Sequence, residues 1–134
     1  MTTRLSGGCL CGAVRYHVGA QLCAPTLCHC ESCRRASGAH AVGWLTVAAG
    51  DVVYESGELR EIESSPGVVR TFCARCGSPL TYRAARRPGE LDVTIGTLDA
   101  PGAAAPVDHV FMADAPPWDR PADGRPQYPG LRPS

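Results

Sequence analysis

The stretch that organises this chain is a cluster of three thiols within six residues, Cys28-His29-Cys30-Glu31-Ser32-Cys33. Thiols at this C-x-C-x-x-C spacing lie close enough along the backbone to converge on one soft metal ion without help from distant segments. Zinc at a thiolate-rich site normally takes four ligands, so three local cysteines leave one coordination position for another group. The cluster therefore predicts an open metal site, at which chemistry can occur.

Two further cysteine pairs lie far apart in the sequence. The first is a C-x-C pair, Cys9-Leu10-Cys11, with glycines on either side that allow a tight turn. The second is a C-x-x-C pair followed by glycine, Cys73-Ala74-Arg75-Cys76-Gly77, which has the form of a zinc knuckle. Together the pairs predict a closed four-cysteine zinc site that ties the N-terminal strand to the middle of the chain and contributes to folding.

Other readings of the cysteines remain open at this point. Both clusters are closed and inert if Cys23 or His29 completes the second tetrahedron, although neighbouring side chains on an extended segment usually point apart, which disfavours His29. Disulfides are disfavoured because the chain starts without an apolar signal sequence. An iron–sulfur cluster ranks below zinc because it normally needs four ligands and the triple has no obvious fourth.

Length and charge limit the classes of function. A chain of 134 residues predicts one domain, residues 1–134, with a modest core. The 13 basic and 13 acidic residues cancel, which disfavours nucleic acid and membrane surfaces as partners. No apolar run is long enough to span a bilayer, so we expect a cytoplasmic protein.

Short alternating segments separated by turn residues predict a mainly β domain with little helix. Residues 31–37 offer one or two turns of helix, stopped at Gly38. From residue 113 to 134 the chain is rich in proline and glycine, and we expect a surface-hugging tail with Trp118 and Tyr128 as its large anchors. The expected strands are 13–18, 41–47, 52–55, 59–62, 68–72, 79–83, 90–95 and 107–112.

Several other side chains are candidates for the site, although each also has a simpler reading. His17 is expected to be solvated, and His40 and His109 to be hydrogen-bonded structural histidines that line the site only if the fold brings them there. Arg34 and Arg35 are either solvated or placed to bind a substrate carboxylate. Trp44 and Trp118 are by default packing residues.

An open three-cysteine zinc has a distinctive chemistry. Three thiolates outweigh one dication and make the centre a weak Lewis acid, so water activation is less natural than at a three-histidine site. Such a centre suits binding another thiol as its thiolate and releasing it again. With an aldehyde held nearby, the sulfur nucleophile forms a carbon–sulfur bond, and the reverse reaction breaks one.

The cysteine motifs, with their flanking residues, form a set of elements that covers nearly the whole chain. The elements are Gly8-Cys9-Leu10-Cys11-Gly12, Cys28-His29-Cys30-Glu31-Ser32-Cys33-Arg34-Arg35, Gly38, Arg70-Thr71-Phe72-Cys73-Ala74-Arg75-Cys76-Gly77-Ser78, Gly96-Thr97-Leu98-Asp99, His109 and Trp118. In these elements the chain resembles the glutathione-dependent formaldehyde-activating enzyme family, which also includes centromere protein V.

The resemblance implies a domain of several coiled antiparallel β-sheets, called a β-tent, and two zinc ions per chain. It implies a structural zinc on Cys9, Cys11, Cys73 and Cys76, and a catalytic zinc on Cys28, Cys30 and Cys33. At the second zinc, glutathione and formaldehyde would condense to S-hydroxymethylglutathione, and the reverse direction is a carbon–sulfur lyase reaction. Cys23 has no role in the family pattern.

Two functions of different classes follow. The leading hypothesis is a zinc-dependent carbon–sulfur lyase-type enzyme that forms or cleaves the S-hydroxymethyl adduct of a small thiol such as glutathione, with an aldehyde as the second substrate. The alternative is a non-catalytic zinc module that binds a thiol or a protein partner. The two differ in whether the three-cysteine site is a reaction centre.

Overall fold

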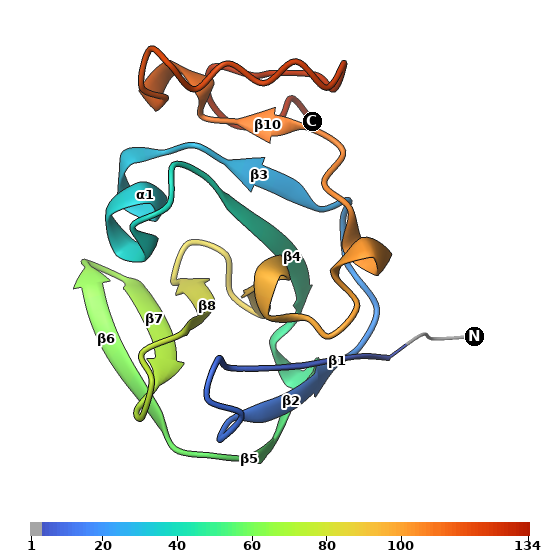
Figure 1. The fold of residues 1–134 in the computed structure, drawn as a ribbon, viewed down its shortest axis with the longest axis vertical. Coiled ribbons are helices and arrows are strands. Elements are labelled where there is room, and N and C mark those ends of the chain that lie inside the picture. The colour runs from blue at the N-terminus through green and yellow to red at the C-terminus, as the bar shows by residue number, and fades with distance from the viewer. Residues whose placement is uncertain (1–3) are drawn as a thin grey trace.

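A computed structural model describes residues 4–134, and residues 1–3 of the predicted domain lie outside the described part. It confirms the mainly β prediction, with two sheets and one short α-helix, α1 at Glu31–Ser37 (Figure 1). No helix in the described part of the chain is long and apolar enough to cross a membrane. The strands are β1 Leu5–Gly8, β2 Arg15–Val18, β3 Thr26–Cys28, β4 Val42–Ala48, β5 Val52–Ser56, β6 Leu59–Ser65, β7 Val68–Cys73, β8 Pro79–Ala84, β9 Glu90–Thr94 and β10 His109–Val110.

The larger sheet has seven strands in the order β10-β3-β4-β9-β8-β7-β6, and the smaller has three in the order β1-β2-β5. All pairs are antiparallel except β10 with β3, which run parallel, with His109 opposite Leu27 and Val110 opposite Cys28. This pair is an exception to the predicted antiparallel arrangement. It places a strand from late in the chain directly beside the three-cysteine segment.

The main hydrophobic core includes inward-facing residues of both sheets. In β2 the predicted alternation holds, because Tyr16 and Val18 are almost fully buried, as is Val14 just before the strand. They belong to one cluster with side chains of the larger sheet such as Leu45 and Val93. The four-cysteine group lies at this core, since Cys9 and Cys73 are both members of the cluster.

Several strands differ from the sequence expectation: β3 was not among the expected strands, and β6 continues to Ser65 instead of ending at residue 62. β1 was not expected as a strand, yet it pairs with β2, and a Cβ at Gly7 would lie 2.5 Å from the Tyr16 hydroxyl oxygen. β10 is shorter than the expected strand 107–112 because Phe111 takes a left-handed conformation with φ 57°. In the described chain Phe111 is the only non-glycine residue at positive φ, and it lies beside the cysteine cluster.

The C-terminal segment 113–134 runs back along β10 at one end of the molecule (Figure 1). The Tyr128 amide donates to the His109 carbonyl at 2.9 Å, and the Phe111 amide donates to the Gly130 carbonyl at 2.9 Å. Tyr128 packs against the cysteine cluster and is an anchor as predicted. The prediction for Trp118 was wrong, because 71% of its surface is exposed.

Candidate metal centres

The first candidate centre joins the two distant cysteine pairs. Cys9 and Cys11 lie in the turn between β1 and β2, while Cys73 ends β7 and Cys76 lies in the turn that follows it. Their four sulfurs lie within 4.8 Å of one another, with Cys9 to Cys11 at 3.5 Å and Cys11 to Cys73 at 3.9 Å. A zinc tetrahedron with bonds of about 2.3 Å has sulfur–sulfur edges of about 3.8 Å, so the arrangement fits such an ion.

Backbone amides of the two turns point at these sulfurs. The Val14 amide donates to the Cys9 sulfur at 3.2 Å, and the Arg75 and Cys76 amides donate to the Cys73 sulfur at 3.3 and 3.4 Å. These are the amide contacts expected of a zinc knuckle, and they stabilise the thiolate form that a metal requires.

Ser78 links the two turns of this centre. Its hydroxyl oxygen accepts a hydrogen bond from the Leu10 amide at 3.0 Å and lies 3.2 Å from the Cys76 sulfur. Hydrogen bonds from the Ser78 hydroxyl and amide lower the pKa of Cys76 to about 5. Cys76 is therefore disposed to be a thiolate, and therefore a metal ligand, at neutral pH.

The second candidate centre is local. Cys28 ends β3, Cys30 caps the N-terminus of α1, and Cys33 lies within that helix. Their sulfurs also lie within 4.8 Å of one another, and no further Cys, His, Asp or Glu ligand atom joins them within residues 4–134. The Cys33 amide donates to the Cys30 sulfur at 3.2 Å, so one predicted ligand caps the helix that carries another.

The three thiols influence one another. Contact with the Cys28 and Cys33 thiols lowers the pKa of Cys30, whereas contact with the Cys30 and Cys33 thiols raises the pKa of Cys28. Contact with Cys28 lowers the pKa of Cys33, but contact with Cys30 and burial outweigh it, so the pKa of Cys33 is raised overall. Trp44 packs against the cluster, as predicted.

His29 lies between Cys28 and Cys30 in the sequence, but its two ring nitrogens have other hydrogen-bond partners. Its Nδ1 lies 2.5 Å from an Asp119 carboxylate oxygen, and its Nε2 lies 2.9 Å from Nδ1 of His109. Nε2 of His109 lies 2.8 Å from Asp123. Both ring nitrogens of His29 are thus engaged, and His29 does not join the sulfurs as a fourth ligand. Cys23, the other alternative, is exposed and also lies outside the group.

The Asp119–His29–His109–Asp123 chain is almost entirely buried at its centre, with His29 only 1% and His109 only 2% exposed. In each ring one nitrogen faces a carboxylate and the other faces the second ring, so all four ring nitrogens have a polar partner. The prediction that His109 is a hydrogen-bonded structural histidine is confirmed. Asp119 and Asp123 were missed because isolated acids in a proline-rich tail give no sequence signal.

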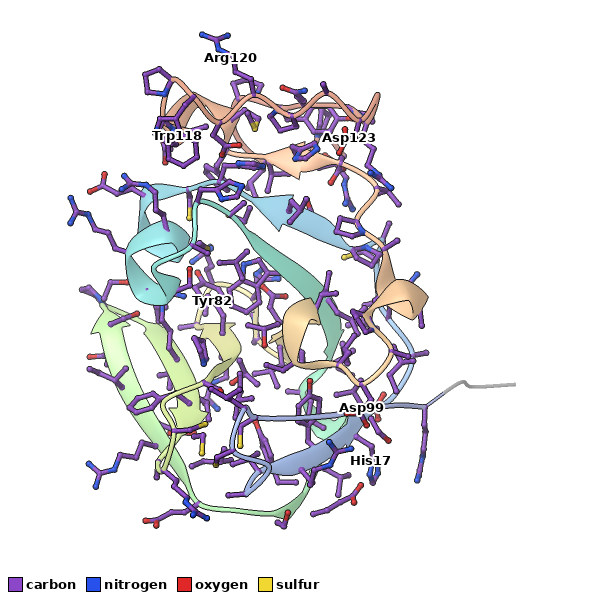
Figure 2. All side chains as sticks on the ribbon, viewed as in Figure 1. His17, Tyr82, Asp99, Trp118, Arg120 and Asp123 are labelled. Atoms are coloured by element: carbon purple, nitrogen blue, oxygen red, sulfur yellow. The ribbon has the colours of Figure 1, made fainter. Side chains whose placement is uncertain are left out.

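The remaining candidates have lesser roles. Arg35 pairs with Glu31 at 3.0 Å on the exposed face of α1, whereas Arg34 has no ion-pair partner among the described residues. His40 is 54% exposed, and its ring centre lies 5.6 Å from that of Trp118. Nδ1 of His17 lies at hydrogen-bond distance, 2.7 Å, from a Glu55 carboxylate oxygen. Figure 2 shows His17 and Asp99 at the opposite end of the molecule from Trp118 and Asp123.

The fold and the two thiol groups define a small β protein with two cysteine centres suited to a soft divalent metal ion. A family model described as "Glutathione-dependent formaldehyde-activating enzyme" matches residues 4–114. The chain belongs to that family, and the match confirms the resemblance noted in the sequence.

Two known proteins are similar to the chain. A Halomonas elongata protein named "Putative glutathione-dependent formaldehyde-activating enzyme" is 31% identical over 85% of this chain and 78% of its own length. The crystal structure of a Rhodobacter sphaeroides protein superposes with a TM-score of 0.62 over 91% of this chain and 98% of that chain, at 22% identity. This second likeness concerns the fold.

Proposed function

We propose that the chain is a carbon–sulfur lyase-type enzyme that forms or cleaves the S-hydroxymethyl adduct of a small thiol such as glutathione. The observation that carries the proposal is the group of three buried or half-buried sulfurs of Cys28, Cys30 and Cys33, which no further protein ligand completes in the described chain. A zinc ion held there would supply a position at which a substrate thiol is bound as its thiolate.

The reaction balances without a redox step. In the forming direction the substrate sulfur bonds to the carbonyl carbon of formaldehyde, and the carbon–oxygen π electron pair moves to oxygen. The oxygen takes up the proton that the thiol has lost. In the cleaving direction the hydroxyl proton leaves, the carbonyl reforms and the carbon–sulfur bond breaks.

The four-cysteine group is assigned a structural role in this proposal. Cys9, Cys11, Cys73 and Cys76 would hold a second zinc and leave it no open position. We also propose that residues 1–134 act as one domain, because the four-cysteine group links the two sheets and the C-terminal segment is bound to the larger sheet.

The test is the rate at which glutathione and formaldehyde interconvert with their adduct. Exchange NMR measures this rate at equilibrium and separates catalysis from the uncatalysed condensation. We expect zinc-loaded wild-type protein to accelerate the exchange in proportion to its concentration, and Cys33→Ser to remove the acceleration. Equal exchange rates with wild type, Cys33→Ser and no protein, for glutathione and for a smaller thiol alike, would reject the enzyme and leave a non-catalytic zinc module that binds a thiol or a protein partner.

A further inference from the structure

A cavity of about 260 Å³ borders the three-cysteine centre. Cys33 and α1 form one side of it, and residues of β4, β6, β7 and β8 form the others. Much of the lining is apolar, with Val42, Trp44 and Phe72 contributing hydrocarbon surface. Because its volume lies below the usual range of about 300–1,000 Å³ for drug-sized ligands, the cavity suits a compact molecule.

The cavity has one charged residue in its lining, Arg70. The Arg70 Nε donates to the Ser64 hydroxyl at 3.1 Å, and its guanidinium carbon lies 5.0 Å from the centre of the Tyr82 ring. Within residues 4–134 no carboxylate pairs with Arg70, whereas Arg15, Arg87 and Arg132 each pair with an aspartate. The terminal nitrogens of Arg70 are thus available to bind an anionic group.

Among residues 4–134, no acidic side chain lines the same cavity. Ile62 and Ser64 of β6 do line it, so the alternating Glu61 and Glu63 belong to the opposite face of that strand. Two of the hydroxyls in the lining already donate within the protein. The Ser37 hydroxyl donates to the Cys33 carbonyl at 2.8 Å, and the Thr94 hydroxyl donates to the Pro79 carbonyl at 3.0 Å. The cavity therefore offers an arginine for a carboxylate and no acidic side chain for an ammonium group.

We propose that the thiol substrate of this chain is a compact thiol acid, whose carboxylate binds Arg70 while its sulfur lies toward Cys33. This inference rests on the proposed function, and it narrows the substrate class. Glutathione carries two carboxylates and an ammonium group, and it would extend out of the cavity with that ammonium group unpaired. A short thiol with a single carboxylate matches both the volume and the charge of the lining.

The test is isothermal titration calorimetry on the zinc-loaded protein with four thiols. 3-Mercaptopropionate carries a carboxylate, 2-mercaptoethanol is neutral, cysteamine carries an ammonium group, and glutathione is the larger comparison. We expect 3-mercaptopropionate to bind at least about tenfold more tightly than 2-mercaptoethanol, because a hydrogen bond between its carboxylate and a charged arginine contributes that much affinity. Cysteamine should bind most weakly, and glutathione no better than 2-mercaptoethanol.

A matched pair of variants tests whether Arg70 causes the preference for a thiol that carries a carboxylate. Arg70→Gln should equalise the affinities for 3-mercaptopropionate and 2-mercaptoethanol. Arg83→Gln, an exposed arginine on the neighbouring strand β8 outside the cavity, should leave the tenfold preference intact. The four-thiol series on wild type tests the charge preference even if Arg70→Gln fails to fold.

The outcomes separate this inference from the proposed function. If no thiol binds the zinc-loaded protein, both the proposed function and the proposed substrate class are rejected. If thiols bind without regard to charge, or if Arg70→Gln keeps the preference, the substrate class is overturned while thiol chemistry at the three-cysteine centre stands. Tightest binding of glutathione, unchanged in Arg70→Gln, also overturns it.

Discussion

The two cysteine centres use the same ligand type, yet they are built in opposite ways. The four-cysteine centre joins segments far apart in the chain, with Cys11 and Cys73 only 3.9 Å apart across 62 residues. The three-cysteine centre draws its ligands from six consecutive residues. A metal at the first centre would close a long loop and so bear on folding, whereas a metal at the second would be held by neighbouring residues and join no distant segments.

The residues that support the sulfurs also differ between the two centres, being local at one and distant in sequence at the other. Turn amides and Ser78 support the four-cysteine sulfurs from within their own two turns. The three-cysteine segment is supported from outside, by His109 and by two aspartates of the C-terminal segment acting through His29. A closed centre needs only its own turns, whereas an open centre needs other parts of the protein to keep its ligands in place.

The largest expected effect separates the two centres directly. Cys73→Ser should abolish cooperative thermal unfolding, because structural zinc sites contribute about 10–16 kcal/mol of apparent binding free energy to folding. Cys30→Ser should keep a cooperative transition, since its metal is bound locally. Circular dichroism melting of both zinc-loaded proteins checks this contrast. Similar melting curves for the two variants would show that the division into structural and open centres is mistaken.

The next effect concerns the support from the C-terminal segment. Asp119→Asn should weaken metal binding at the three-cysteine centre by up to about 10-fold, the low end for loss of a direct partner of a ligand, because Asp119 acts on the sulfurs only through His29. His29 would lose its carboxylate partner and release the segment between Cys28 and Cys30. Chelator competition with cobalt-loaded protein, followed by the thiolate charge-transfer band, measures each centre.

The matched control for that prediction is Asp99→Asn, which removes an exposed ion pair with Arg15 at the other end of the molecule (Figure 2). It should leave both cobalt affinities unchanged. If Asp119→Asn also behaves like wild type, the buried histidine chain has no part in holding the sulfurs.

The sequence predicted features built from neighbouring residues better than features that depend on the long-range path of the chain. The cysteine groups were predictable because local spacing and glycine turns constrain where the sulfurs point, and α1 with its stop at Gly38 followed for the same local reason. The parallel pairing of β10 with β3 was not, because it depends on the path of the chain between them. Asp119 and Asp123 acquire their roles only through that pairing.

A smaller effect is expected at the C-terminal ion pair. Arg132→Gln leaves Asp108, whose side chain is only 5% exposed, with Thr26 as its remaining side-chain partner. The free energy of unfolding should fall by about 1–3 kcal/mol, the cost of an underpaired buried group. Urea denaturation measures the change, and the zinc content should stay at the wild-type value. A variant as stable as wild type would mean that this pair does not secure the segment.

The smallest effect is a shift in acid sensitivity at the four-cysteine centre. Hydrogen bonds from Ser78 lower the pKa of Cys76 to about 5, so its thiolate persists as the pH falls toward that value. Ser78→Ala removes the hydroxyl bond and lets protons compete at higher pH. Zinc release, followed with a chromophoric chelator, should therefore begin about 0.5 pH unit higher in the variant. A release curve shifted to lower pH would contradict the role given to Ser78.

The central claim is that the chain carries one closed and one open metal centre, and zinc content per chain tests it most directly. Elemental analysis of wild type and Cys30→Ser, both purified under reducing conditions, should give two zinc ions per chain in the first and one in the second. One zinc ion in both proteins would contradict the account, because the three-cysteine group would then hold no metal and the protein would be a zinc-stapled binding domain.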